Sequence, residues 1–139
     1  LNEISNEIPL FFSMHPRTKN MMKKYNLKIS ENIKILEPQS YLDFLLLMRD
    51  SKIIFTDSGG IQEESTILKI PCYTLRNNTE RPITITQGTN HLIGTEKNKI
   101  LNAFQKFGFS INKNYKSPKL WDGKSADRIA QHLISILEI

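Results

Sequence analysis

Cysteine is almost absent from this sequence, since Cys72 is the only one among 139 residues. A single cysteine excludes an intrachain disulfide framework and any cysteine-rich metal site. Long hydrophobic runs are also missing, so no membrane partner is expected. Residues 1–5 lack the basic start and apolar segment of a signal peptide. We therefore expect a protein of a reducing, cytoplasmic compartment.

Charge of one sign does not gather anywhere along the chain. The net charge is +5 with 24% charged residues, a balance that favours anionic ligands such as nucleotide phosphates. No basic stripe with stacking aromatic residues supports a nucleic-acid partner. The three histidines, His15, His91 and His132, have no metal-binding spacing, so we expect no metal.

Strand-like and helix-like segments alternate along a chain long enough for one globular domain. We expect strands at residues 8–14, 33–36, 52–56, 72–75 and 91–94. We expect helices at residues 18–25, 41–50, 60–68, 97–107 and 126–137, with a helix or turn at 83–87 and a loop at 112–122. The last helix would carry one apolar face, made of Ile129, Leu133, Ile136 and Leu137. The alternation predicts an α/β fold: a Rossmann-like parallel sheet flanked by helices.

The carboxyl ends of the expected strands carry the polar residues that could bind a ligand. In a parallel α/β sheet the ligand lies at those ends. One site built from several loops is therefore predicted, from His15, Pro38, Asp57 with Ser58, Arg76 and Gly94.

The segment Asp57–Glu64 is the most informative part of the chain. Ser58, Gly59 and Gly60 follow a buried strand and start a helix, where free backbone N–H groups and the helix dipole favour a phosphate. The alternative is a tight strand-to-helix turn with a serine cap and no ligand. Gln62, Glu63 and Glu64 come next, and helix geometry lets only one of the two acids face the ligand.

Several further residues have both a binding and a structural interpretation. Arg81, before Pro82, suits bidentate phosphate contacts, although exposed arginines are usually solvated. Phe44 would edge a base pocket or pack in the core. The turn at residues 88–90 would contact the ligand near Arg81 or only precede a strand.

The strings TDSGGIQEE at residues 56–64, NTERP at 78–82, GTN at 88–90 and LEPQ at 36–39 together resemble the non-hydrolysing UDP-N-acetylglucosamine 2-epimerases. The resemblance covers nearly the whole chain and keeps the motifs in order. It implies two Rossmann-like domains facing a cleft, as in GT-B glycosyltransferases. Residues 1–139 would be the C-terminal UDP-binding domain, and the N-terminal domain would be absent from this chain.

The same resemblance implies roles for individual residues. Arg81 and Glu64 would be the catalytic residues, Arg81 near the phosphates and Glu64 at the ribose hydroxyls. His15 would lie where some bacterial members bind a second, activating UDP-sugar. The residues that would contact UDP are Ser58, Gly59, Gly60, Glu64, Arg81, Phe44, Pro38 and Gln39.

The implied reaction converts UDP-N-acetylglucosamine into UDP-N-acetylmannosamine, in polysaccharide biosynthesis, by elimination and re-addition of UDP. It needs no cofactor, and the full-length protein would be a homodimer. The family's candidate acid/base carboxylates lie mostly in the N-terminal domain, so this chain alone is expected to bind UDP without turnover. A UDP-sugar glycosyltransferase and a stand-alone UDP-sugar-binding module are the alternatives.

Overall fold

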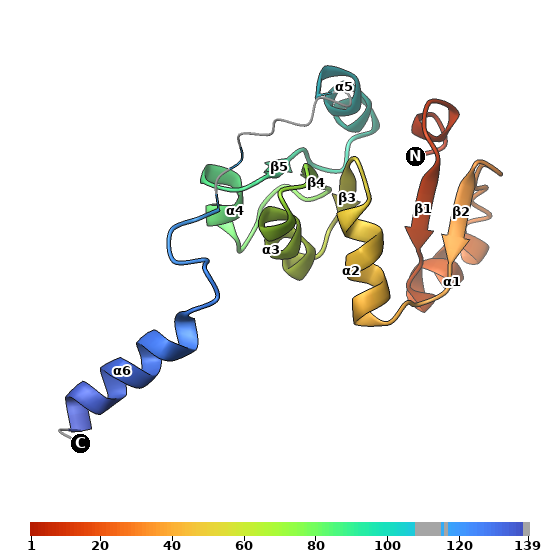
Figure 1. Cartoon of the computed structure of the whole chain (residues 1–139). Coiled ribbons are helices and arrows are strands. Elements are labelled where there is room, and N and C mark those ends of the chain that lie inside the picture. Colours follow the sequence, from red (N-terminus) through yellow and green to blue (C-terminus); the bar gives the residue numbers. More distant parts are fainter. Residues whose placement is uncertain (108–114, 116, 138–139) are drawn as a thin grey trace. The chain divides into compact units, whose positions relative to one another are not determined.

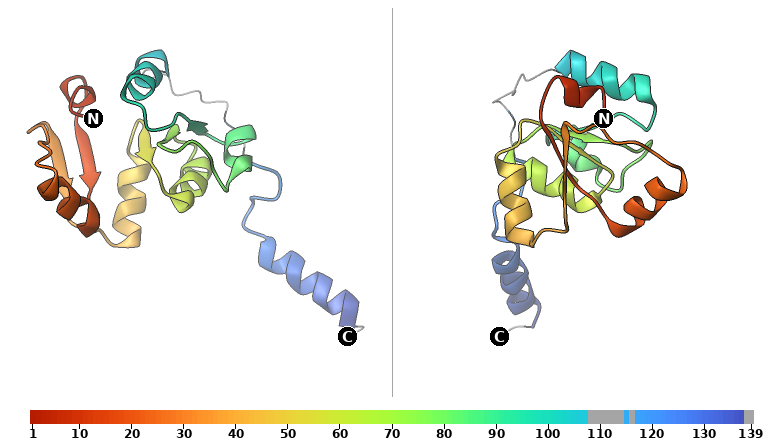
Figure 2. Two further views of the ribbon diagram at one scale, coloured as in Figure 1. Left: turned by 180° about the vertical axis from the view of Figure 1, so that it is seen from behind. Right: turned by 90° about the vertical axis from the view of Figure 1, so that its right-hand side faces the viewer.

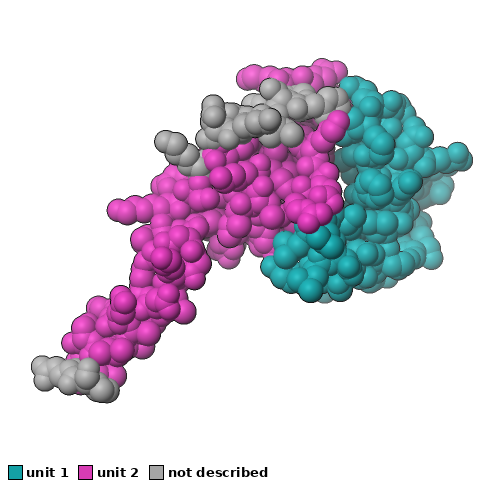
Figure 3. Space-filling view, viewed as in Figure 1, with its two compact units in different colours: residues 1–47 teal, residues 48–139 magenta. Residues whose placement is uncertain are grey.

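The computed structural model describes residues 1–107, 115 and 117–137. These residues form two compact units, Leu1–Leu47 and Met48–Ile139, which Figure 3 shows in different colours. The loop expected at 112–122 lies partly outside the described residues. No helix in the described part is long and apolar enough to cross a membrane.

The first unit is built on two parallel strands, β1 (Leu10–Ser13) and β2 (Ile33–Leu36), preceded by a 3-10 turn, η1 (Ile4–Asn6). Helix α1 (Pro16–Lys24) connects the two strands (Figure 1). It begins with a proline at its first position. Backbone N–H groups in the first turn make no hydrogen bond within the helix, so the proline removes none. Just beyond its end, Asn26 adopts a left-handed conformation with φ 50°, a conformation that stops helices.

Helix α2 (Tyr41–Arg49) crosses the boundary between the two units. The hydroxyl of Ser40 accepts a hydrogen bond of 3.3 Å from the backbone N–H of Asp43. This contact satisfies one of the free donors at the helix start. Ser40 therefore caps the start of α2.

The second unit contains three parallel strands in the order β3 (Ile54–Thr56), β4 (Cys72–Thr74) and β5 (Asn90–Leu92). All three residues of the central strand β4 are buried, as expected for a parallel strand covered on both faces. Helix α3 (Gly59–Leu68) lies on one side of this sheet and α5 (Lys97–Phe107) on the other, in every view (Figures 1 and 2). A short helix, α4 (Pro82–Thr86), occupies the position expected for a helix or turn.

The predicted α/β class is confirmed, with parallel strands and flanking helices. The strands are nevertheless divided between a two-stranded and a three-stranded sheet, where one sheet was expected. Strand β3 pairs with β4 along all three of its residues and is an edge strand of the three-stranded sheet. Helix α6 (Ser125–Leu137) closes the chain, but the residues of its apolar face are exposed.

Candidate functional site

The carboxyl edge of the three-stranded sheet gathers the residues that the sequence placed there. Thr56, Thr74 and Leu92 are register partners at the ends of β3, β4 and β5. The loops that contain Ser58, Arg76 and Gly94 therefore start at one edge. The backbone N–H of Gly94 donates to the carbonyl oxygen of Arg76 at 3.1 Å. Gly94 has φ +75°, so this close approach requires glycine.

His15 and Pro38 follow β1 and β2, at the carboxyl edge of the other sheet. They belong to the first unit, and the remaining loops belong to the second. The convergence of all five loops on one site therefore stays a prediction.

Ser58 occupies the N-cap of α3 in an extended conformation, with φ −83° and ψ 132°. Its side chain makes no capping hydrogen bond, whereas its backbone N–H donates to the hydroxyl of Thr56 at 3.1 Å. The first backbone N–H groups of a helix have no acceptor within the helix. Without the serine oxygen as a cap, these donors and the positive end of the dipole are left to an outside acceptor.

Packing inside the protein does not explain the two glycines of the first turn. A methyl group built on Gly59 would meet no atom within 4 Å, and one on Gly60 would meet only the Ser58 hydroxyl, at 4.0 Å. Neither glycine has a positive φ. The turn geometry therefore does not need glycine here, which weighs against the turn-only alternative. Their effect is to leave the backbone of the first turn uncovered.

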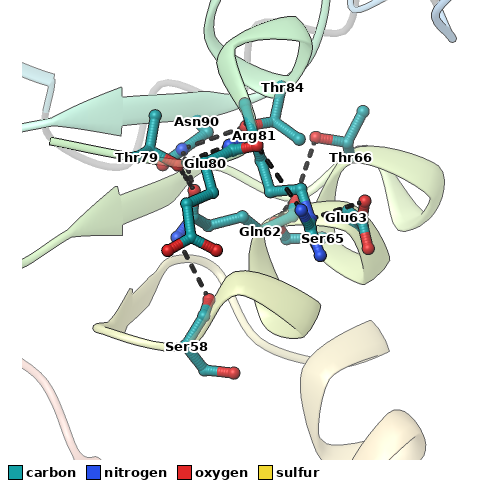
Figure 4. A network of polar contacts seen from close by, with 10 residues as sticks. All are labelled: Ser58, Gln62, Glu63, Ser65, Thr66, Thr79, Glu80, Arg81, Thr84 and Asn90. Carbon is teal, nitrogen blue, oxygen red and sulfur yellow. Dashed lines mark hydrogen bonds and ion pairs between the residues drawn. The ribbon is translucent and has the colours of Figure 1, made fainter.

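Gln62 points into the protein and not toward a ligand. Its side chain is fully buried. The side-chain amide donates to the carbonyl oxygen of Ser58 at 3.2 Å. Its Oε1 atom accepts from the Thr79 hydroxyl at 2.6 Å and from the Asn90 amide at 3.0 Å (Figure 4). Both polar atoms of the Gln62 side chain are therefore engaged within the protein.

Arg81 lies beside α3, as Figure 4 shows. It is the N-cap residue of α4, and its backbone N–H donates to the Thr79 hydroxyl at 3.0 Å. Its Nε atom lies 2.9 Å from Oε1 of Glu63, in an ion pair whose side chains are 42% and 40% exposed. That contact lacks the alignment of a hydrogen bond, and the Nε atom itself is buried. The guanidinium is thus paired with Glu63 while part of it faces solvent.

Glu63 and Glu64 are separated by this geometry. Glu63 pairs with Arg81. Glu64 is half-buried, and within the described part of the chain it makes no side-chain hydrogen bond or ion pair. One acid is therefore engaged by the protein. The role of Glu64 at a ribose stays a prediction.

The turn at residues 88–90 also belongs to the interior. Both amide hydrogens of Asn90 are used, one by Gln62 and one by the Thr84 hydroxyl at 3.1 Å. Its oxygen accepts from the Thr74 hydroxyl at 2.6 Å. Asn90 therefore has no side-chain donor left for a ligand, which favours the alternative in which this turn only precedes a strand. A side chain on Gly88 would come within 2.5 Å of the Thr84 carbonyl oxygen, so close packing explains this glycine.

The residues expected around a base lie in the first unit. Phe44 is half-buried on α2, and Pro38 and Gln39 are exposed. The Gln39 amide donates to the carbonyl oxygen of Glu37 at 2.6 Å. Phe44 is not fully buried, so its packing in the core is not confirmed. The base pocket stays a prediction.

His15 has a structural role in the described chain. Its Nδ1 atom accepts a hydrogen bond of 3.2 Å from the backbone N–H of Arg17, at the start of α1. The activating site at His15 stays a prediction. No group of three or more histidine, cysteine, aspartate or glutamate side chains among the described residues could bind a metal ion.

Comparison with known proteins places this geometry in a family. The family model described as UDP-N-acetylglucosamine 2-epimerase matches residues 1–134. A UDP-N-acetylglucosamine 2-epimerase of Methanocaldococcus jannaschii is 48% identical over 89% of this chain and 34% of its own length. One of Methanococcus maripaludis is 43% identical over 90% of this chain and 35% of its own length. The chain thus spans about a third of the curated relatives it matches.

A solved structure agrees with the sequence relatives. The Methanocaldococcus jannaschii UDP-GlcNAc 2-epimerase in complex with UDP-GlcNAc and UDP matches with a TM-score of 0.80 and 46% identity. The match covers 96% of this chain and 37% of that one. The fold of the chain is therefore that of part of such an enzyme.

Proposed function

This chain belongs to the UDP-N-acetylglucosamine 2-epimerase family, and from that premise we propose that it supplies the UDP-binding half of such an enzyme. The observation that carries the proposal is the uncovered first turn of α3 with Arg81 beside the same helix. A helix start and a guanidinium both favour a diphosphate. Two independent anion-binding features are thus found at α3, one in its first turn and one on the neighbouring Arg81.

We assign the diphosphate to Ser58, Gly59, Gly60 and Arg81. Glu64 would bind the ribose hydroxyls. Phe44, Pro38 and Gln39 would contact the uracil. These assignments are supported by the family motifs and by the exposure of Ser58 and Gly60.

In the proposed reaction a base removes the C2 proton of UDP-N-acetylglucosamine, and UDP leaves to give a 2-acetamidoglucal. UDP then adds back to give the opposite configuration at C2. Negative charge grows on the departing diphosphate during elimination. Backbone N–H groups fixed at the start of α3, together with the Arg81 guanidinium, would stabilise this charge without rearranging. Neither a redox cofactor nor a metal is needed for this step.

The proposed binding role is tested by calorimetric titration with UDP. Arg81→Ala and Glu64→Ala should each weaken binding by about tenfold or more, because each removes a charged hydrogen-bonding partner. Arg49→Ala is the matched control, since it removes the same charge from an exposed pair with Asp50. Unchanged affinity in both test variants would contradict the assigned site.

The proposed reaction is tested on the polypeptide at its natural length. Incubation with UDP-N-acetylglucosamine in heavy water should place deuterium at C2 without any acceptor. A glycosyltransferase would instead require an acceptor and leave C2 unlabelled. Absence of label with intact UDP binding would refute the epimerase activity and retain the binding role.

A further inference from the structure

Gln62 contacts both halves of the proposed diphosphate site. At one end its amide donates to the carbonyl oxygen of Ser58, the N-cap residue of α3, at 3.2 Å. At the other end its Oε1 atom accepts from the hydroxyl of Thr79 at 2.6 Å. The Gln62 side chain is fully buried, so these bonds are shielded from solvent on the Gln62 side.

Thr79 extends this connection to Arg81. Its hydroxyl donates to Gln62 and accepts from the backbone N–H of Arg81 at 3.0 Å. A continuous path therefore runs from Ser58 through Gln62 and Thr79 to Arg81 (Figure 4). It joins the N-caps of α3 and α4.

A second path reinforces the first. The Asn90 amide donates to Gln62 Oε1 at 3.0 Å and to the Thr84 hydroxyl at 3.1 Å. The Thr84 hydroxyl donates to the carbonyl oxygen of Arg81 at 2.7 Å. Both backbone polar groups of Arg81 are therefore fixed by the same buried network.

This inference rests on the proposed function. We propose that Gln62 is a positioning residue, which fixes the backbone of Arg81 relative to the first turn of α3 so that both contact one diphosphate. Donors that are already in place lose no conformational entropy when the anion binds, and the binding free energy is therefore more favourable. Gln62 itself would not touch UDP. Its loss should weaken the contacts to the phosphates and spare those to the nucleoside.

The test compares UDP with uridine, which lacks the phosphates, on the polypeptide at its natural length. Gln62→Met keeps the side-chain length and removes all three side-chain hydrogen bonds. Thr79→Val removes the connecting hydroxyl, whereas the separate variant Thr79→Ser keeps a hydroxyl at this position. We expect UDP affinity to fall by about tenfold or more in the first two variants, with uridine affinity within about twofold of the original. Thr79→Ser should recover UDP binding.

Ser65→Ala is the matched control. Ser65 lies on the same helix, is also fully buried, and donates to the backbone oxygen of Gln62 at 3.1 Å. It contacts neither Ser58 nor Arg81 by a hydrogen bond in the described chain. This variant should keep the original ratio of UDP to uridine affinity, even if it lowers stability.

Each outcome separates the inference from the proposed function. An unchanged ratio in Gln62→Met and Thr79→Val, or equal losses for both ligands, overturns the positioning role and leaves the UDP site standing. A wild-type protein that binds UDP no better than uridine overturns the proposed site and the positioning role together. If Gln62→Met does not fold, the pair Thr79→Val and Thr79→Ser decides, because Thr79 is only half-buried.

Discussion

Replacing Gly59 by alanine should strengthen the fold and weaken ligand binding at once. The new methyl group would meet no atom within 4 Å, so it adds no steric cost. Alanine also restricts the unfolded chain, and at a compatible position this change stabilises a protein by about 0.4–1 kcal/mol. Gly59 is the first residue of α3, where alanine is also the better helix former.

The cost should appear only when UDP is present. Charged oxygens approach backbone N–H groups to about 2.9 Å, and a methyl group on Gly59 would occupy the space next to those donors. Loss of a hydrogen bond to a charged group costs about 1.5–3 kcal/mol. The dissociation constant for UDP should therefore rise by roughly tenfold to a hundredfold.

Thermal unfolding with and without UDP measures both effects. Without ligand, Gly59→Ala should raise Tm by a few degrees, and calorimetry should show the loss of affinity. Gly88→Ala is the contrasting control, since its methyl group would lie 2.5 Å from the Thr84 carbonyl oxygen. That overpacking should lower stability by about 1–3 kcal/mol. If Gly59→Ala binds UDP within about twofold of the original, no phosphate lies over the first turn of α3, and the reasoning fails.

Three further predictions concern single side chains. Arg128 hydrogen-bonds Asp122 and lowers the pKa of its carboxyl to about 2. The ionised carboxylate should therefore stabilise the folded state fully above the unfolded pKa of about 3.9, and this stabilisation should disappear as the pH falls toward 2. NMR titration checks this, and Arg128→Leu should move the pKa back up. Burial raises the pKa of the Cys72 thiol to about 11, so a thiol reagent at mildly basic pH should label the unfolded protein only, and rapid native labelling would contradict this. Glu63→Gln frees Arg81 from its ion pair and should raise UDP affinity by up to about fivefold, because half-exposed pairs are worth at most about 1 kcal/mol; weaker binding in a titration would show that Glu63 helps to bind UDP.

The elements around the site could be predicted because their signals are local. An apolar strand that ends at two glycines fixed the start of α3, and the segment from Thr79 to Pro82 placed Arg81 before a short helix. The parallel direction of β3, β4 and β5 then followed from strand–helix alternation.

The direction of Gln62 could not be predicted in the same way. Its partners Thr79 and Asn90 lie 17 and 28 residues further along the chain, and only the tertiary fold brings them together. One signal was present: Gln62, Ser65 and Thr66 share a helix face, and all three are buried. A polar face of that kind needs polar partners inside the protein. The division into two sheets likewise depends on pairing and not on local sequence.

The buried network around Gln62 permits a single orientation of its amides. Turning the Gln62 amide over would set its N–H groups against the Asn90 donor and its oxygen against the carbonyl oxygen of Ser58. Amides and hydroxyls neither gain nor lose protons between mildly acidic and mildly basic solution. The spacing that this network imposes between the starts of α3 and α4 should therefore not depend on pH.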